Sequence, residues 1–256
     1  MYNELKRELY KMKHRKLPWA IVVLLIIFMA TMGVAMGRDY GKLLVMTCYN
    51  SSQIIMLILV LVGSTIFSTE FQNGTIRSLL YHSPNKKSIY FAKLMAMFLY
   101  DVFLHLMAVA ITVLFNSNSI INNPVSWNSI YKYHHTLFLN MIMTSGIDLV
   151  SSMLIISIVC LTSCLINSNT IVIVVNAAIV FMGSSVSANL LNAGVSYKDI
   201  VRWNPFNMLN LTTQYYNYST YHLTSMLSNN QLFLGTVCYT TMFVIIGFII
   251  FNRKKY

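Results

Sequence analysis

Glu70-Phe-Gln-Asn-Gly-Thr-Ile-Arg-Ser-Leu-Leu-Tyr-His-Ser-Pro-Asn-Lys-Lys-Ser-Ile-Tyr-Phe-Ala-Lys93 is a polar stretch between two long apolar runs of this chain. A simple connection between two helices needs only a few solvated residues. This stretch instead carries one Gly, one Pro and four basic residues. We therefore expect it to form a surface helix that contacts another protein and faces the cytoplasm.

The composition of the whole chain is typical of an integral membrane protein. Hydrophobic residues make up 56% of the 256 residues, charged residues make up 10%, and the mean hydropathy is +0.61. A soluble domain of this length has about a quarter of its residues charged. The composition therefore excludes an ordinary soluble domain.

Six apolar runs approach or exceed the ~20 residues that a helix needs to cross a bilayer. We expect an all-α integral membrane protein in which residues 17–256 form a single transmembrane domain. The second run opens with several polar residues, and the fourth is longer than a straight span requires, so it can bend or protrude. The six predicted spans cover about residues 17–36, 49–68, 89–115, 137–166, 170–191 and 232–251.

The distribution of Lys and Arg predicts the orientation of the chain in the membrane. Six basic residues precede the first span, four lie in the 70–93 stretch and three follow the last span, which places 13 of the 18 on one side. Short loops rich in Lys and Arg stay in the cytoplasm. We therefore expect both termini to be cytoplasmic. The formal charge of +11 is interpreted as this topology signal and as attraction to anionic membrane lipids, with no role in binding nucleic acid.

Residues 1–16 are predicted to form a basic amphipathic helix at the membrane surface. Leu5, Leu9 and Met12 recur at helical spacing among Lys, Arg and Glu. Such a helix lies in the plane of the headgroups. Pro18 then turns the chain into the first span.

Three ionisable residues fall within predicted spans, where a charge is costly and usually faces protein or water. Asp101 and His105 are four residues apart in the third span and can face one another, while Asp148 lies in the fourth. Two interpretations stay open. A proton-coupled carrier can use these groups as its pathway, or they can form polar contacts that fix helix packing, which is the interpretation we favour.

The chain lacks sequence motifs of an enzyme. It has no phosphate loop, no dinucleotide-binding glycine pattern and no zinc-protease or nucleophile-elbow motif. Cys160 and Cys164 are spaced for one helix face, and His134 and His135 are adjacent, but neither pair has further ligands nearby, so no metal site is expected. Any energy for transport must come from a partner or an ion gradient.

The opening stretch also resembles a sequence pattern of ABC-2 type exporter permeases, E-x-x-x-G-T-[IL]-[RK]-x-[LV]-L followed by [SP]-x-[RK] and [AG]-K. More narrowly, the chain resembles the small Gram-positive six-span permeases of bacitracin resistance, lantibiotic immunity and phenol-soluble-modulin export. In such permeases the segment after the second span is a coupling helix that fits a groove of the ATPase subunit. The residues that match, and to which the resemblance assigns docking, are Glu70, Gly74, Thr75, Arg77, Leu79, Leu80, Pro84, Lys86 and Lys87.

The resemblance gives these residues physical roles. Glu70 would end the second span and pair with a basic group of either subunit, because a carboxylate suits the start of the coupling helix. Gly74 would allow a tight bend or a close approach. Thr75 would cap the helix that begins at Ile76.

The second half of the stretch would make the contact and return the chain to the membrane. Arg77 would offer one charge, and Leu79 and Leu80 an apolar ridge, to the ATPase groove. Pro84 would end the helix. Lys86, Lys87 and Lys93 would then hold the chain at the headgroups.

The segment between the fifth and sixth spans, about Asn192–Gln231, is long and rich in Tyr and Trp. Such residues favour the membrane interface. We expect a re-entrant or interfacial segment on the outer face, as in the family, and favour a scaffolding role over contact with the substrate.

The resemblance implies that the chain is the permease subunit of an ATP-driven exporter in the bacterial cell membrane. The expected cargo is an amphipathic or membrane-active peptide, exported for toxin secretion, self-immunity or resistance. The expected partners are a second copy or a sister permease and two separate ATPase subunits, which bind ATP and Mg. This chain itself is expected to bind no cofactor and to catalyse no reaction.

Two other classes of function stay open. A proton-coupled secondary exporter would depend on Asp101, His105 and Asp148 and would need no ATPase. A non-transporting immunity or adaptor protein would protect cells even when the partner ATPase cannot hydrolyse ATP.

Overall fold

The computed structural model describes residues 2–36, 40–76, 81, 85–117, 124–193 and 197–254. The described chain is helical, and six of its segments are long and apolar enough to cross a membrane, which confirms the predicted fold class. The helices of these segments are α2 (Lys16–Met36), α4 (Ser51–Gln72), α6 (Lys86–Ser117), α7 (Leu137–Leu165), α8 (Asn169–Asn192) and α12 (Asn229–Arg253).

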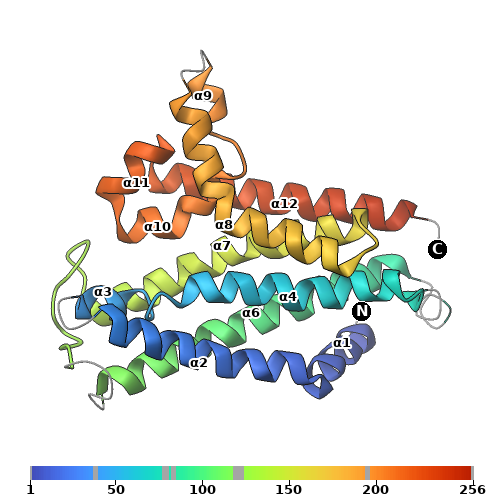
Figure 1. Ribbon diagram of the computed structural model, residues 1–256, viewed down its shortest axis with the longest axis horizontal. Coiled ribbons are helices and arrows are strands. Elements are labelled where there is room, and N and C mark those ends of the chain that lie inside the picture. Colours follow the sequence, from blue (N-terminus) through green and yellow to red (C-terminus); the bar gives the residue numbers. More distant parts are fainter. Residues whose placement is uncertain are drawn as a thin grey trace.

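The long helices run side by side in an elongated bundle (Figure 1). The labels N and C lie toward the same end, together with α1 (Tyr2–His14). We call this the terminal end. The other end, which we call the cap end, holds α3 (Gly41–Met46), α10 (Leu211–Tyr216) and α11 (Tyr218–Ser225).

Helix α7 forms the centre of the bundle. It packs against α12, α4, α6 and α8. Of its apolar stretch, 67% is buried, compared with 22% for α8 and 17% for α12. The chain therefore covers α7 itself and leaves much of α8 and α12 to be covered by lipid or by another protein.

Close packing around α12 depends on a small residue. A Cβ added at Gly247 would lie 2.7 Å from the Tyr90 hydroxyl oxygen and 3.6 Å from Leu161 Cα. The Tyr90 side chain is fully buried, and its hydroxyl donates a hydrogen bond to the Val244 carbonyl at 2.8 Å. Small residues at such contacts let membrane helices approach closely.

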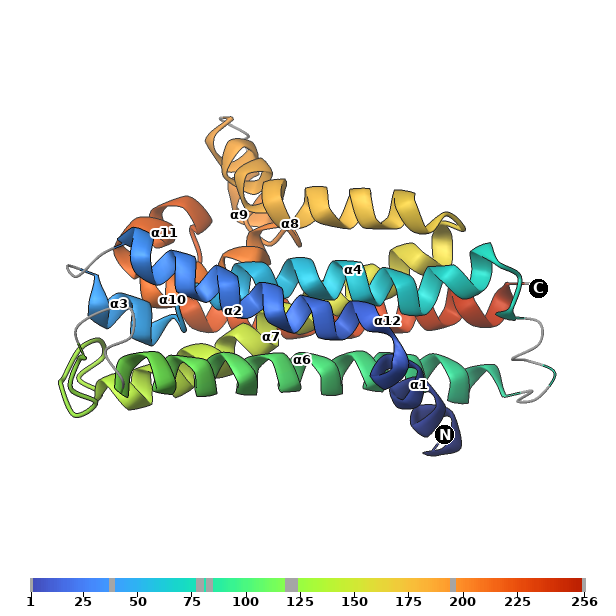
Figure 2. The same cartoon turned by 60° about the horizontal axis from the view of Figure 1, so that its bottom comes forward.

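Helix α1 does not continue the axis of α2 but lies across the bundle and packs on α6 (Figure 2). Its buried residues are Glu4, Glu8 and Met12, whereas Leu9 is exposed. The face that contacts the protein is therefore acidic, and this arrangement requires basic partners on the neighbouring helices.

The stretch between α3 and α4 turns through three consecutive left-handed residues, Cys48, Tyr49 and Asn50, with φ of 47°, 53° and 58°. The Tyr49 amide donates a hydrogen bond to the Leu44 carbonyl at 2.7 Å. Left-handed backbone is unfavourable for such residues unless the surroundings hold it. Here Cys48 and Tyr49 are both buried.

The cap end is closed by the 3-10 helix η1 (Asn207–Asn210), α10 and α11, while α9 (Lys198–Val201) lies with the end of α8 on a projection from the bundle (Figure 1). Buried amides hold these short helices together. Asn207 Nδ2 donates to the carbonyls of Arg202 and Ser225 at 2.6 and 2.8 Å, and Gln214 Nε2 donates to the Leu227 carbonyl at 2.8 Å. These hydrogen bonds are internal to the chain and join η1, the end of α11 and α10.

We expect Gly247→Ala to lower the free energy of unfolding by about 1–3 kcal/mol, because the added methyl group overpacks the rigid Tyr90 contact. Thermal melting in detergent measures this effect. Gly146→Ala is the matched control, since Gly146 is also helical but a Cβ there meets nothing within 4 Å. That variant should be neutral or more stable by about 0.5–1 kcal/mol. Equal melting temperatures of Gly247→Ala and Gly146→Ala would contradict the packing argument.

Candidate functional site

The 70–93 stretch lies at the terminal end, between α4 and α6. Helix α4 ends at Gln72, and Gly74 follows with φ of +66°. A Cβ at Gly74 would meet nothing within 4 Å, so this glycine serves a bend and not a close approach. Thr75 is exposed and Ile76 is buried. Arg77, Leu79, Leu80 and Pro84 lie outside the described residues.

The entrance to this stretch is held by a ring of four buried or half-buried charges. Glu70 Oε1 lies 2.7 Å from Lys11 Nζ, and Glu70 Oε2 lies 2.8 Å from Lys93 Nζ. Glu8 Oε1 closes the ring at 2.9 Å from Lys11 Nζ and 3.4 Å from Lys93 Nζ. We call Glu8, Lys11, Glu70 and Lys93 the charge ring. It is neutral overall and joins α1, α4 and α6.

Lys93 is the most deeply buried member of the charge ring. Its side chain is 1% exposed and is therefore enclosed by protein, so it does not hold the chain at the headgroups as expected from the sequence. Its ammonium also donates to the Ile66 carbonyl at 3.0 Å and lies 6.0 Å from the centre of the Phe67 ring. An ammonium in such a place is stable only because it is paired and hydrogen-bonded.

The charge ring also sets the chemistry of Lys11 on α1. Burial by itself lowers the pKa of the Lys11 ammonium, but the hydrogen bond and the negative charge of Glu70 outweigh burial and raise this pKa above its ordinary value. Lys11 therefore stays charged throughout the physiological pH range.

A second set of contacts joins the end of α4 to the start of α8. Ser68 Oγ donates to Asn169 Oδ1 at 2.7 Å. The backbone N–H of Asn169 donates to Gln72 Oε1 at 3.1 Å. Asn169 is the first residue of α8, where a backbone amide has no partner within its own helix. Gln72 therefore caps α8 from α4.

The exit from the stretch is attached to two further helices by lysine side chains. Lys86 Nζ, at the start of α6, donates to the carbonyls of Asn252 and Lys254 at 3.1 and 3.0 Å. Lys254 Nζ in turn donates to the Cys164 carbonyl at 3.1 Å, near the end of α7. Cations suit helix C-termini, whose last carbonyls lack partners. Lys87, by contrast, is exposed.

These contacts connect the stretch to the rest of the bundle. Its entrance is attached to α1, α6 and α8, and its exit to α12. The stretch therefore has side-chain contacts with four helices. Glu70 contributes to this attachment by pairing within its own chain.

The residues predicted within the spans are brought together. Asp101 Oδ1 lies 3.1 Å from His105 Nδ1, and Asp101 Oδ2 accepts a hydrogen bond from Ser152 Oγ at 2.5 Å. Asp101 is fully buried, and this contact joins α6 to α7. The predicted Asp101–His105 contact is therefore present in the structure.

Asp148 and His105 have polar atoms without partners. Asp148 is 3% exposed and close enough to interact electrostatically with His105. Among the described residues, Asp148 Oδ1 and His105 Nε2 are buried and have no hydrogen-bond partner. Within the same described residues, no group of three His, Cys, Asp or Glu side chains could hold a metal ion.

A hollow of about 230 Å³ lies at the cap end between α4, α8, η1, α10 and α11. Its lining combines apolar and polar side chains. Met56, Phe181 and Leu209 contribute carbon surface, while Gln53 and Thr213 contribute hydrogen-bonding groups. Such a lining suits a ligand that is itself amphipathic.

Sequence reasoning missed Glu8 and Lys11 as members of the charge ring. Their spacing of three residues on a predicted helix was a usable signal for a local ion pair. Their contact with Lys93 and Glu70 was not predictable, because it depends on how α1 crosses α6.

Comparison with known families adds one finding. A family model described as ABC-2 family transporter protein matches residues 4–184, which is more than half of the chain. The match includes the charge ring and the Asp101–His105–Asp148 cluster and ends within α8. No curated protein matches the chain.

We expect Lys93→Met to lower the free energy of unfolding by about 3–5 kcal/mol, because it leaves a buried carboxylate without its partner. Thermal melting in detergent checks this, and Lys87→Met is the control, since this exposed lysine of α6 should change stability by less than about 0.5 kcal/mol. Glu70→Gln/Lys93→Met removes both charges and should recover part of the loss. The charge ring would have no structural role if Lys93→Met melted like Lys87→Met.

Proposed function

Because the chain belongs to the ABC-2 family of transporter proteins, it is the membrane-spanning permease component of an ABC transporter, and we propose that its ATPase partner docks on residues 70–93. The observation that carries this proposal is the attachment of the stretch to four helices. A simple loop needs no such attachment. A segment that receives force from an ATPase does, because force passes only through contacts that resist deformation.

In the proposed mechanism, closure of the ATPases on ATP displaces the stretch and its attached helices. The charge ring transmits the displacement to α1 and α6, and the Gln72–Asn169 contact transmits it to α8. Lys86 transmits it to α12. The bundle thereby alternates between arrangements that take up and release cargo.

The terminal end faces the cytoplasm in this proposal, and the membrane is the bacterial cell membrane. The support is the excess of Lys and Arg in three sequence segments, residues 1–16, 70–93 and 252–256, which hold 13 of the 18 in the chain. Two ATPase subunits bind below two permease copies, or below this permease and a sister. The exposed apolar sides of α8 and α12 supply surface for the contact between permeases.

The proposed cargo is an amphipathic or membrane-active peptide. The resemblance to small Gram-positive peptide exporters supports this class of cargo, and so does the mixed lining of the hollow at the cap end. Apolar side chains such as Met56 and Phe181 would contact the apolar face of the peptide. Polar groups such as Gln53 would contact its polar face.

We expect affinity purification of the chain from its native membrane in mild detergent to recover an ATPase with a phosphate loop. Arg77→Ala should lower this recovery about tenfold or more, because an Arg at a docking surface often contributes about 2 kcal/mol or more. Lys42→Ala is the control, since Lys42 is exposed and lies in α3 at the cap end. Glu70 is not used here, because its loss also breaks the charge ring.

Two results would contradict the proposed docking site. One is the absence of any ATPase with a protein that melts normally. The other is equal recovery with Arg77→Ala and Lys42→Ala.

A proton-coupled exporter is a second candidate, favoured by the unpartnered atoms of His105 and Asp148. The two candidates differ in their source of energy. When a fluorescent amphipathic peptide is added outside inverted vesicles, we expect its uptake to require ATP, to survive a proton ionophore, and to remain after Asp148→Asn. Uptake that needs a pH gradient and is lost in Asp148→Asn would establish the secondary exporter instead.

A further inference from the structure

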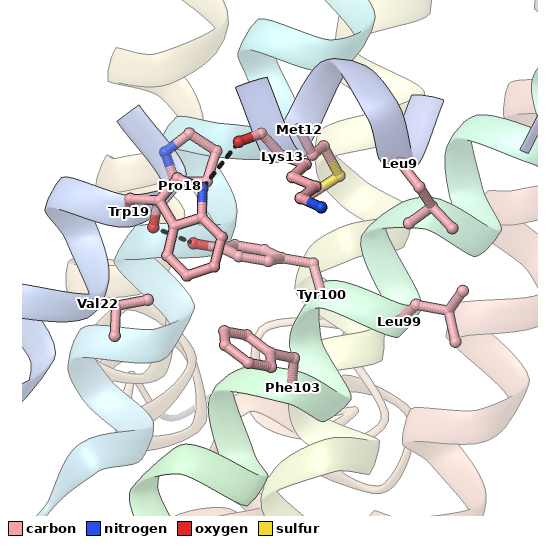
Figure 3. Close-up of a pocket in the computed structure, with 9 residues that line it drawn as sticks. All are labelled: Leu9, Met12, Lys13, Pro18, Trp19, Val22, Leu99, Tyr100 and Phe103. Carbon is pink, nitrogen blue, oxygen red and sulfur yellow. Dashed lines mark hydrogen bonds between the residues drawn. The ribbon is translucent and has the colours of Figure 1, made fainter. Parts of the chain in front are cut away.

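A groove at the terminal end lies between α1, α2 and α6 (Figure 3). Its volume is about 220 Å³. Each helix contributes carbon surface: Leu9 and Met12 from α1, Trp19 and Val22 from α2, and Leu99 and Phe103 from α6. The groove is separate from the charge ring, although α1 contributes to both.

The polar atoms of the aromatic lining residues are directed at backbone carbonyls. Trp19 Nε1 donates to the Lys13 carbonyl at 2.9 Å, and the Tyr100 hydroxyl donates to the Pro18 carbonyl at 3.1 Å. These hydrogen bonds leave the ring carbons to line the groove (Figure 3). The interior therefore favours a ligand that is purely hydrocarbon.

The size of the groove fits a section of an acyl chain. An apolar protein cavity of about 150 Å³ stays dry and binds benzene. The volume here, about 220 Å³, is larger, and the groove lies where α1 meets α2, a helix long and apolar enough to cross a membrane. Acyl chains are the apolar ligand available at this depth.

The groove has one charged lining residue, which is basic, and a basic segment follows it in the chain. Lys13 lines the groove, and His14, Arg15 and Lys16 follow as exposed residues. The carboxylates of α1, Glu4 and Glu8, are buried and do not line the groove. Within the described part of the chain, no acidic side chain lies within ion-pair distance of Lys13. A negatively charged headgroup is therefore the complementary ligand for these basic residues.

We propose that the groove is a specific binding site for an anionic phospholipid. One acyl chain occupies the space between α1, α2 and α6, and the headgroup phosphate contacts Lys13. A cationic amphipathic peptide is disfavoured, because its charge would be repelled by Lys13, Arg15 and Lys16. A phosphate without an acyl chain would leave the apolar groove empty.

Bound lipid would also affect the charge ring. Leu9, Met12 and Lys13 lie on the same short helix as Glu8 and Lys11. A lipid that packs against one face of α1 holds the ionic face of that helix on Lys93. The lipid composition of the membrane would thereby influence how firmly α1 is attached to the 70–93 stretch.

Trp19 provides a reporter at the groove itself. The other two Trp residues, Trp127 and Trp203, are replaced by Phe, and the protein is titrated in mixed micelles with phospholipids brominated on the acyl chain. Bromine quenches Trp fluorescence on contact, so quenching measures acyl chains next to Trp19. Brominated phosphatidylglycerol is compared with brominated phosphatidylcholine. If the double Phe variant does not fold, the quenching of Trp19 is obtained as the difference in quenching between wild type and Trp19→Phe.

Phosphatidylglycerol is expected to bind more tightly than phosphatidylcholine. Lys13→Gln should weaken the binding of phosphatidylglycerol about fivefold. This change corresponds to the loss of one basic contact at a membrane surface. Quenching by phosphatidylcholine should not change. Lys6→Gln is the matched control, because Lys6 is exposed on α1 but does not line the groove, and its effect should be less than about twofold.

Three results would overturn the proposal. Equal quenching by the two lipids would remove the headgroup preference. An equal effect of Lys6→Gln and Lys13→Gln would mean that the headgroup preference arises from the general positive charge of the surface and not from the groove. Relief of quenching by an amphipathic peptide, without relief by unlabelled phosphatidylglycerol, would assign the groove to cargo. None of these readouts depends on the ATPase, so they also stand if the proposed docking site fails.

Discussion

The Lys93 ammonium is the group on which the terminal end of the bundle depends. It is 1% exposed, and a charge so placed is tolerated only with ionic and hydrogen-bonding partners. Glu70 and Glu8 supply the ionic partners, and the Ile66 carbonyl supplies a hydrogen bond. Because these partners lie on α4 and α1, satisfying one ammonium fixes the crossing of three helices.

The contacts around the 70–93 stretch share one physical principle. Helix ends expose backbone groups that lack partners, and polar side chains from neighbouring helices satisfy them. Gln72 caps the start of α8, Lys86 the end of α12, and Lys254 the end of α7. Each cap joins two helices where the stretch enters or leaves the bundle. The same hydrogen bonds therefore stabilise the fold and make the stretch mechanically continuous with it.

The sequence predicts the six spans because crossing a bilayer requires an apolar run of about 20 residues, and such runs are visible one at a time. The contact between Asp101 and His105 is predictable for the same reason, since four residues on one helix set it. The charge ring is different. Lys93 is 85 residues from Glu8, and its pairing depends on the angle at which α1 crosses α6, which no local pattern records. Local charge patterns thus assign lipid headgroups as the partners of Lys93, whereas its partners are protein groups.

The buried polar groups of this bundle are of two kinds, those with hydrogen-bond partners and those without, and the two kinds respond differently to a rearrangement of the helices. In the cap, Asn207 and Gln214 donate to carbonyls of neighbouring segments, so any rearrangement would break hydrogen bonds without replacing them. Between α6 and α7, Asp148 Oδ1 and His105 Nε2 have no partner among the described residues, so a shift of these helices can gain contacts as well as lose them. Fully paired polar groups favour one arrangement, whereas unpaired ones lower the cost of leaving it. The amides of Asn207 and Gln214 therefore favour the observed arrangement of the cap, whereas the contact of α6 with α7 combines a buried hydrogen bond, from Ser152 to Asp101, with polar atoms that a rearrangement can satisfy.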